Sequence, residues 1–106
     1  MSGAGEERPR PIRLSPAEIR ALVDGGRTLV VDTRSPAEFA EGALPGAVNA
    51  PWPRIKRPLG VVERTTPVAV YCDTGARARK TAEVMVAMGF TRIYLIGAMR
   101  RYHEAE

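Results

Sequence analysis

Cys72 is the only cysteine in this sequence, and its neighbours are residue types that can activate a thiol. A short apolar run ends at Cys72, a polar turn follows, and a helical pattern then runs from about Arg77 to Met88. The backbone N–H groups of residues 73–77 would then surround the sulfur at a helix start, where anions bind and a thiolate is favoured. Gly75 would let the loop adopt positive φ. The pattern predicts Cys72 as a nucleophile; the plainer alternative is a buried thiol that only caps a strand.

Two arginines are candidates for binding an anionic substrate. Arg34 follows a second apolar strand, and ligands of parallel sheets bind beyond the carboxyl ends of strands, so an arginine near the thiol at this edge would hold an anionic substrate. The alternative is a structural ion pair with Asp32, to which we assign a scaffolding role. Arg77 either reaches the ligand from the end of the loop or is a solvated residue of the first helical turn. Asp73 would oppose a thiolate and an anionic substrate unless its side chain turns outward.

Other kinds of chemistry find little support in the sequence. His103, the single histidine, lies in a polar segment near the end of the chain, and we expect it to be solvated. Without a histidine partner, a protease-like Cys–His mechanism has no basis. No cluster of Cys, His and Asp has the spacing of metal ligands, so we expect neither a metal nor a cofactor.

The composition favours a single small domain. The chain has 106 residues, of which 44% are hydrophobic, and its net charge of +4 is scattered along the sequence. No basic run is interleaved with aromatic residues, so we expect no nucleic acid partner. One cysteine excludes an internal disulfide and fits a reducing compartment, and no apolar run reaches the length of a membrane span. We therefore expect a cytoplasmic protein without a membrane partner.

Alternating strands and helices must position the thiol. Residues 1–11 are polar and proline-containing, and we expect them to be disordered, ahead of one domain over residues 12–106. The pattern Ser-Pro-Ala-Glu occurs at 15–18 and 35–38 and predicts two helix starts, with Ser as N-cap, Pro at N1 and Glu at N3. The expected strands are 12–14, 28–32, 47–49, 68–72 and 92–95. A helical turn near Ile55 and a last helix at 99–105 complete the pattern, which indicates an α/β domain with a mainly parallel sheet.

Three segments share the order and spacing of a known set of motifs. They are VVDTRSPAEF at residues 30–39, GALPGAVNAP at 42–51 and YCDTGAR at 71–77. Together they resemble the rhodanese-homology domain, the single-domain sulfurtransferase type, over residues 12 to about 104.

The sequence departs from the family pattern in two regions. Ala43 stands where the second motif usually has His, and Gly97-Ala98 and Tyr102 stand where the family often has Gly-Gly and Trp. These positions lie outside the catalytic loop, so the departures concern local packing more than chemistry.

The resemblance implies a fold and a set of roles. The fold would be a single rhodanese-like α/β domain with a five-stranded parallel sheet in the order 1-5-4-2-3, flanked by helices. Cys72 would carry a persulfide, and Arg34 would help to bind an anionic donor. The remaining substrate-binding residues would be those of the loop: Asp73, Thr74, Gly75, Ala76 and Arg77.

The expected activity is sulfur transfer from thiosulfate or a similar donor to a thiophilic acceptor such as cyanide or a thiol. One alternative is a sulfur-relay or binding module that hands its persulfide to a protein partner. Another is a Cys-based phosphatase or arsenate reductase, whose similar loop has five residues between Cys and Arg. Here four residues separate Cys72 from Arg77, and the tighter ring suits a sulfur atom better than a tetrahedral oxyanion.

Overall fold

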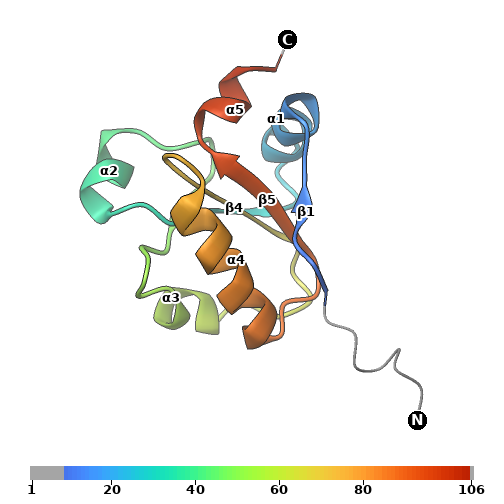
Figure 1. Ribbon diagram of the computed structural model, residues 1–106, viewed down its shortest axis with the longest axis vertical. Coiled ribbons are helices and arrows are strands. Elements are labelled where there is room, and N and C mark those ends of the chain that lie inside the picture. The colour runs from blue at the N-terminus through green and yellow to red at the C-terminus, as the bar shows by residue number, and fades with distance from the viewer. Residues whose placement is uncertain (1–8, 106) are drawn as a thin grey trace.

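Five parallel strands form one sheet, with the strand that ends at Cys72 in its centre (Figure 1). The computed structural model describes residues 9–105, so residues 1–8 of the predicted disordered terminus lie outside it. The sheet order is β1-β5-β4-β2-β3, which confirms the order implied by the family resemblance. The strands are β1 (Ile12–Arg13), β2 (Leu29–Asp32), β3 (Val48–Asn49), β4 (Val68–Cys72) and β5 (Ile93–Ala98).

The helices begin where local signals predict. Both Ser-Pro-Ala-Glu segments form complete capping boxes, in which Ser accepts the N3 amide and the N3 Glu accepts the Ser amide. A third helix begins next to Ile55, and the longest begins at Ala76, one residue before its predicted start. The helices are α1 (Pro16–Gly25), α2 (Pro36–Glu41), α3 (Lys56–Gly60), α4 (Ala76–Met88) and α5 (Arg100–His103).

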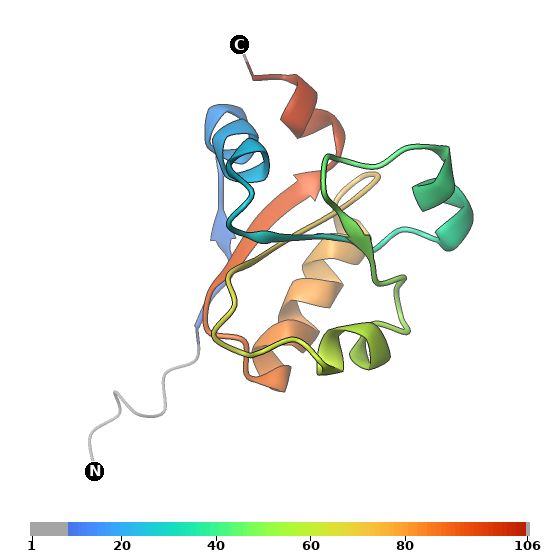
Figure 2. The same ribbon diagram turned by 180° about the vertical axis from the view of Figure 1, so that it is seen from behind.

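The two faces of the sheet are covered by different helices (Figures 1 and 2). Helices α3 and α4 pack on one face, where Ile55, Leu59 and Met85 are fully buried. Helix α1 packs on the other face through Ile19 and Val23, and α5 lies beside α1. No helix within residues 9–105 is long and apolar enough to cross a membrane.

Side-chain alternation in β4 divides its residues between these faces. Val68, Val70 and Cys72 belong to the apolar cluster beneath α4, whereas Ala69 and Tyr71 belong to the cluster beneath α1. All five residues are buried. The thiol therefore faces α4, and the ring of Tyr71 points to the opposite side of the sheet.

Strand β5 is longer than predicted and contains an irregularity beside the loop. The β4–β5 register pairs Val70 with Leu95 but Tyr71 with Gly97, so Ile96 is an extra residue on the β5 side. Gly97 has a φ of +86°, which a residue with a side chain rarely adopts. As a result Ala98 pairs with Cys72, and the Met99 amide donates to the Cys72 carbonyl at 2.9 Å.

Candidate active site

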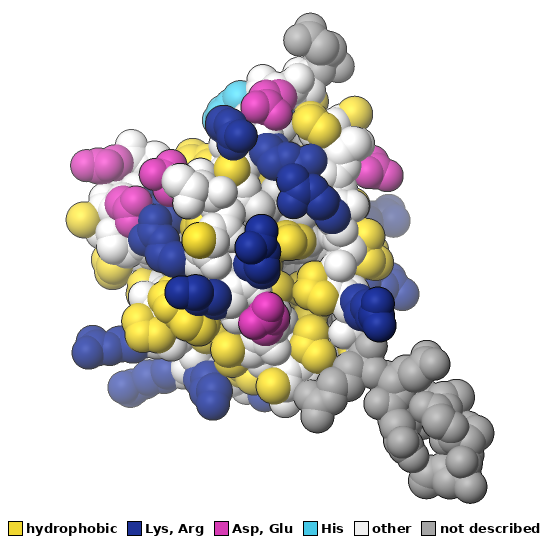
Figure 3. Space-filling model, viewed as in Figure 1, with side chains coloured by type: hydrophobic (Ala, Val, Ile, Leu, Met, Phe, Trp, Pro, Cys, Tyr) yellow, Lys and Arg dark blue, Asp and Glu magenta, His cyan; other side chains and the backbone are white. Residues whose placement is uncertain are grey.

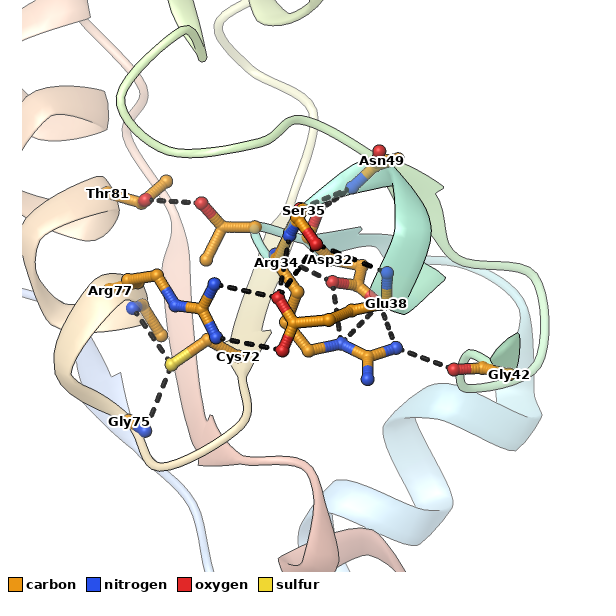
Figure 4. A network of polar contacts seen from close by, with 12 residues as sticks. Asp32, Arg34, Ser35, Glu38, Gly42, Asn49, Cys72, Gly75, Arg77 and Thr81 are labelled. Atoms are coloured by element: carbon orange, nitrogen blue, oxygen red, sulfur yellow. Dashed lines mark hydrogen bonds and ion pairs between the residues drawn. The ribbon is translucent and has the colours of Figure 1, made fainter. Parts of the chain in front are cut away.

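The loop between β4 and α4 holds the sulfur of Cys72 with backbone amides (Figure 4). The N–H of Gly75 donates to Sγ at 3.0 Å and the N–H of Ala78 donates at 3.3 Å. The thiol is fully buried, so these two donors provide the polar contacts in its surroundings. Donors fixed in this way stabilise negative charge on sulfur without reorganising.

Ala78 was not among the loop residues predicted from the sequence. It is the third residue of α4, and the first N–H groups of a helix have no acceptor within the helix. One such free amide is therefore available to the sulfur. The predicted ring of amides ended at residue 77, although the free N–H groups at the start of this helix include that of Ala78.

Gly75 shapes the loop through its backbone conformation. Its φ is +108° and it is the N-cap residue of α4. A Cβ at this position would lie 3.7 Å from the Gly97 carbonyl carbon, which is ordinary contact. The positive φ, rather than a lack of space, therefore calls for glycine here. At Gly75 the loop packs against the backbone of Gly97 and Ala98 in β5.

Arg77 is joined to Glu38 rather than left free in solvent. Its Nη1 donates to Glu38 Oε1 at 2.9 Å and its Nη2 donates to Oε2 at 3.3 Å. Both side chains are about one-third exposed, at 35% and 32%. The Arg77 hydrogen bonds, followed by those from Ser35, lower the pKa of Glu38 to about 2. The pKa of Arg77 is raised, chiefly by its bond to Glu38 and also by the nearby charges of Cys72 and Asp73.

Arg34 occupies a different position from the one expected for a donor-binding residue. Its Nε and Nη2 donate to the carboxylate of Asp32, and Nη2 also donates to the Gly42 carbonyl at 2.6 Å. The ion pair is buried, and the bond to Asp32 is the main cause that raises the pKa of Arg34. In Figure 4 the guanidinium points toward Gly42 and away from Cys72. This geometry supports the scaffolding alternative.

The strand register explains where Arg34 points. Asp32 pairs with Tyr71, and the Tyr71 hydroxyl donates to Asp32 Oδ2 at 2.7 Å. Asp32 thus lies on the face opposite the thiol, and Arg34, two residues on, follows it. The residue between them, Thr33, faces α4 and shares a buried 2.8 Å hydrogen bond with Thr81.

Tyr71 was not assigned a role from the sequence, yet it connects three segments. Besides donating to Asp32, its hydroxyl accepts the Leu44 amide at 2.9 Å. Burial is the main cause that raises its pKa. The side chain of Asn49 adds bonds to the carbonyls of Asp32 and Arg34. These hydrogen bonds connect the ends of β2, β3 and β4 with the loop that contains Leu44.

The remaining predicted loop residues are at the surface. Asp73, Thr74 and Ala76 are exposed, and Asp73 has no polar contact with the sulfur. His103 is exposed on α5, as expected. Within residues 9–105, no three His, Cys, Asp or Glu side chains are grouped so that they could hold a metal ion.

The comparisons with known proteins agree with this geometry. A family model of the rhodanese-like domain matches residues 15–105. The chain belongs to the rhodanese-like domain family. The rhodanese-like domain of the Anabaena protein Alr3790 has the same fold, with a TM-score of 0.78 over 89% of this chain and 74% of that one, at 14% identity.

Two relatives illustrate the range of this rhodanese-like family. A protein named sulfurtransferase from Allochromatium vinosum is 32% identical over 72 residues, covering 68% of this chain and 67% of that protein. A tRNA uridine(34) hydroxylase from Teredinibacter turnerae is 35% identical over 98 residues, covering 86% of this chain. The match spans only 30% of the hydroxylase, so the rhodanese-like chain corresponds to one part of that longer protein.

Proposed function

We propose that this rhodanese-like protein transfers sulfane sulfur from thiosulfate, or a similar anionic donor, through a persulfide on Cys72. The observation that carries the proposal is the pair of amides, from Gly75 and Ala78, that donate to the Cys72 sulfur. They favour the thiolate that attacks and also the anionic persulfide that results. We assign attraction of the anionic donor to Arg77, which lies in the first turn of α4 directly after the loop and is about one-third exposed.

The proposed reaction has two displacements at sulfur. The Cys72 thiolate attacks the outer sulfur of thiosulfate, a new S–S bond forms, and the sulfur–sulfur bond of thiosulfate breaks as sulfite leaves with its electron pair. Cyanide or a thiol then attacks the outer sulfur of the persulfide, and Cys72 leaves as the thiolate. The covalent intermediate implies ping-pong kinetics. Each step conserves electrons without a redox cofactor.

The loop length disfavours the phosphatase alternative. Four residues separate Cys72 from Arg77, one fewer than in the phosphatase loop, and the tighter ring suits a sulfur atom better than a tetrahedral oxyanion held at its centre. The hydroxylase activity of the longer relatives is not carried over, because only a rhodanese-like segment is shared. We place the protein in the cytoplasm, where a catalytic thiol remains reduced between turnovers.

Intact mass measurement tests the proposal directly. Thiosulfate should add one sulfur atom, about 32 Da, to the wild-type protein, and cyanide should remove it. Cys72→Ser should show no gain. If neither thiosulfate nor polysulfide changes the mass of the wild type, the sulfur-transfer proposal is wrong. A gain that only a protein partner, and not cyanide or a small thiol, can remove would identify the relay alternative.

A further inference from the structure

A polar pocket lies on the other side of the active-site loop from Arg77 and Glu38. Its volume is about 130 Å³, and it lies between the loop, β1, β5 and α5. Neither Cys72 nor Arg77 lines it, so it opens away from the thiol, although it shares Thr74 and Gly75 with the active-site loop. The polar residues and loop positions that matter here are Arg13, Thr74, Gly75, Arg79, Arg100 and Arg101.

Arg101 is the fixed cation of this pocket. Its Nη1 donates to the Ile96 carbonyl at 2.9 Å and its Nη2 donates to the Leu14 carbonyl. The side chain is partly buried, and no carboxylate of residues 9–105 lies within ion-pair distance of it. Carbonyl oxygens orient the guanidinium but do not neutralise it. A partly desolvated charge of this kind attracts an anion.

The other arginines add to this positive potential. Arg13 and Arg79 are exposed, and neither forms an ion pair with any carboxylate of the described chain. Arg100 lies 3.6 Å from Glu104, but both side chains are at least half exposed, so this pair neutralises the charge weakly. The lining of the pocket includes no acidic residue. Figure 3 shows basic side chains gathered over this side of the molecule, along α4 and toward α5.

The size of the pocket limits what it can hold. The volume of about 130 Å³ is well below that of pockets that hold drug-sized ligands. Such a space admits one compact tetrahedral group but not a nucleobase or a drug-sized ligand, whose pockets begin at about 300 Å³. Arginine guanidinium groups match the geometry of phosphate oxygens.

We propose that this pocket is a second anion site, which binds one phosphate group against the outer side of the active-site loop. Arg101 orients the group, and Arg13 and Arg79 close over it from β1 and α4. The chemistry is the same for a free phosphate, a terminal phosphate ester or a phosphodiester.

Paired arginine variants test the site with inorganic phosphate as the probe. Arg13→Gln/Arg79→Gln removes two pocket charges, and Arg27→Gln/Arg92→Gln removes two exposed charges that do not line the pocket. In calorimetric titration at constant ionic strength, the control variant should bind phosphate with the same Kd as the wild type. The pocket variant should bind about tenfold more weakly or worse, because charge-assisted contacts are lost. Equal Kd values for both variants, as expected if phosphate bound in the Cys72 loop, would overturn the proposal.

A measurement on the wild type alone provides an independent check. Phosphate should cause the largest amide NMR shifts at Gly97, Ala98 and Arg101, which line the pocket outside the Cys72 loop. Shifts confined to other segments would contradict the site even if a variant failed to fold. Dimethyl phosphate then distinguishes the sources. Tighter binding of inorganic phosphate supports a free or terminal phosphate, and tighter binding of dimethyl phosphate supports a phosphodiester.

Discussion

The guanidinium of Arg77 and the carboxylate of Glu38 join the active-site loop to helix α2 across 39 residues of sequence. Glu38 also completes the capping box of α2 by accepting the Ser35 amide at 3.0 Å. The same carboxylate therefore stabilises a helix start and orients the loop arginine. The two functions share one titratable group, which makes the arrangement sensitive to acid.

Glu38→Gln should destabilise the protein at neutral pH and lose this effect in acid. The pKa of Glu38 is about 2 in the fold, below its ordinary value of 4.5, so the carboxylate contributes stability above pH 4.5. That contribution declines as the pH falls toward 2. Melting temperatures of wild type and variant should therefore differ by a constant amount from neutral pH down to about 5 and converge below about 4. Glu41→Gln, at the exposed end of α2, is the control. An undiminished difference at pH 3 would contradict the prediction.

Arg77→Ala should raise the KM for thiosulfate about tenfold, if the proposed sulfur transfer is correct. A charge-assisted contact is worth about 1.5–3 kcal/mol, and the lower end applies because Arg77 is one-third exposed and already paired. Removal of sulfur from a preformed persulfide should change little. Steady-state kinetics beside Arg92→Ala, which loses the same charge elsewhere, measure the effect. A lower melting temperature with an unchanged KM would limit Arg77 to tethering the loop.

Arg34→Ala should affect stability instead of donor binding. Without Arg34, the fully buried Asp32 loses its ionic partner, and breaking a buried pair costs about 3–5 kcal/mol. Arg34→Lys should recover only part of this, because a lysine cannot donate to Asp32 and to the Gly42 carbonyl in the same geometry. Urea denaturation gives the stability, and kinetics on the folded fraction give the KM. A raised KM for thiosulfate at near-normal stability would instead indicate that Arg34 binds the donor.

Tyr71→Phe should cost about 1–3 kcal/mol of folding free energy. The substitution keeps the buried ring but removes the hydroxyl that bonds to Asp32 and accepts the Leu44 amide. The buried Leu44 amide would then lose its acceptor, and Asp32 would lose one donor while keeping its bonds to Arg34. Tyr94→Phe is the matched control, since the Tyr94 side chain is only partly buried. Chemical denaturation gives the free energy of unfolding of both variants. An equal decrease in the two would mean that the Tyr71 hydroxyl makes no specific contribution to stability.

Gly75→Ala should slow alkylation of Cys72 by iodoacetamide. A side chain strains a residue at φ +108° by about 1–3 kcal/mol, and relief of that strain would move the amide that lies 3.0 Å from the sulfur. Gly25→Ala, at the end of α1, meets no atom within 4 Å and should leave the alkylation rate unchanged. An unchanged rate in Gly75→Ala would show that the loop tolerates the substitution without moving its donors.

Features that depend on neighbours in sequence were predictable. The capping boxes at Ser15 and Ser35 formed as predicted, because Ser, Pro and Glu act within a single turn. The end of β4 at Cys72 also matched, since a buried strand followed by a glycine turn is a local pattern. The sheet order came from the family resemblance, because no local pattern specifies which strands become neighbours.

Features that depend on tertiary contacts were not predictable in the same way. The separation of Arg34 from Cys72 follows from the pairing of Asp32 with Tyr71, and that register is visible only in the assembled sheet. The arginine pocket combines Arg13 with Arg101, whose guanidinium bonds to a carbonyl 87 residues away. The fold therefore brings arginines that are far apart in the sequence together around one pocket.

The pairing of the first strand with the last affects how the protein matures during synthesis. Ile12 pairs with Tyr94 in β5, and β5 also carries Gly97, against which the loop rests. The ribosome must therefore release nearly the whole domain before the sheet closes and the amide donors reach the thiol. The two amide donors to the Cys72 sulfur are therefore expected to reach their positions only after β1 and β5 have both been synthesised and paired.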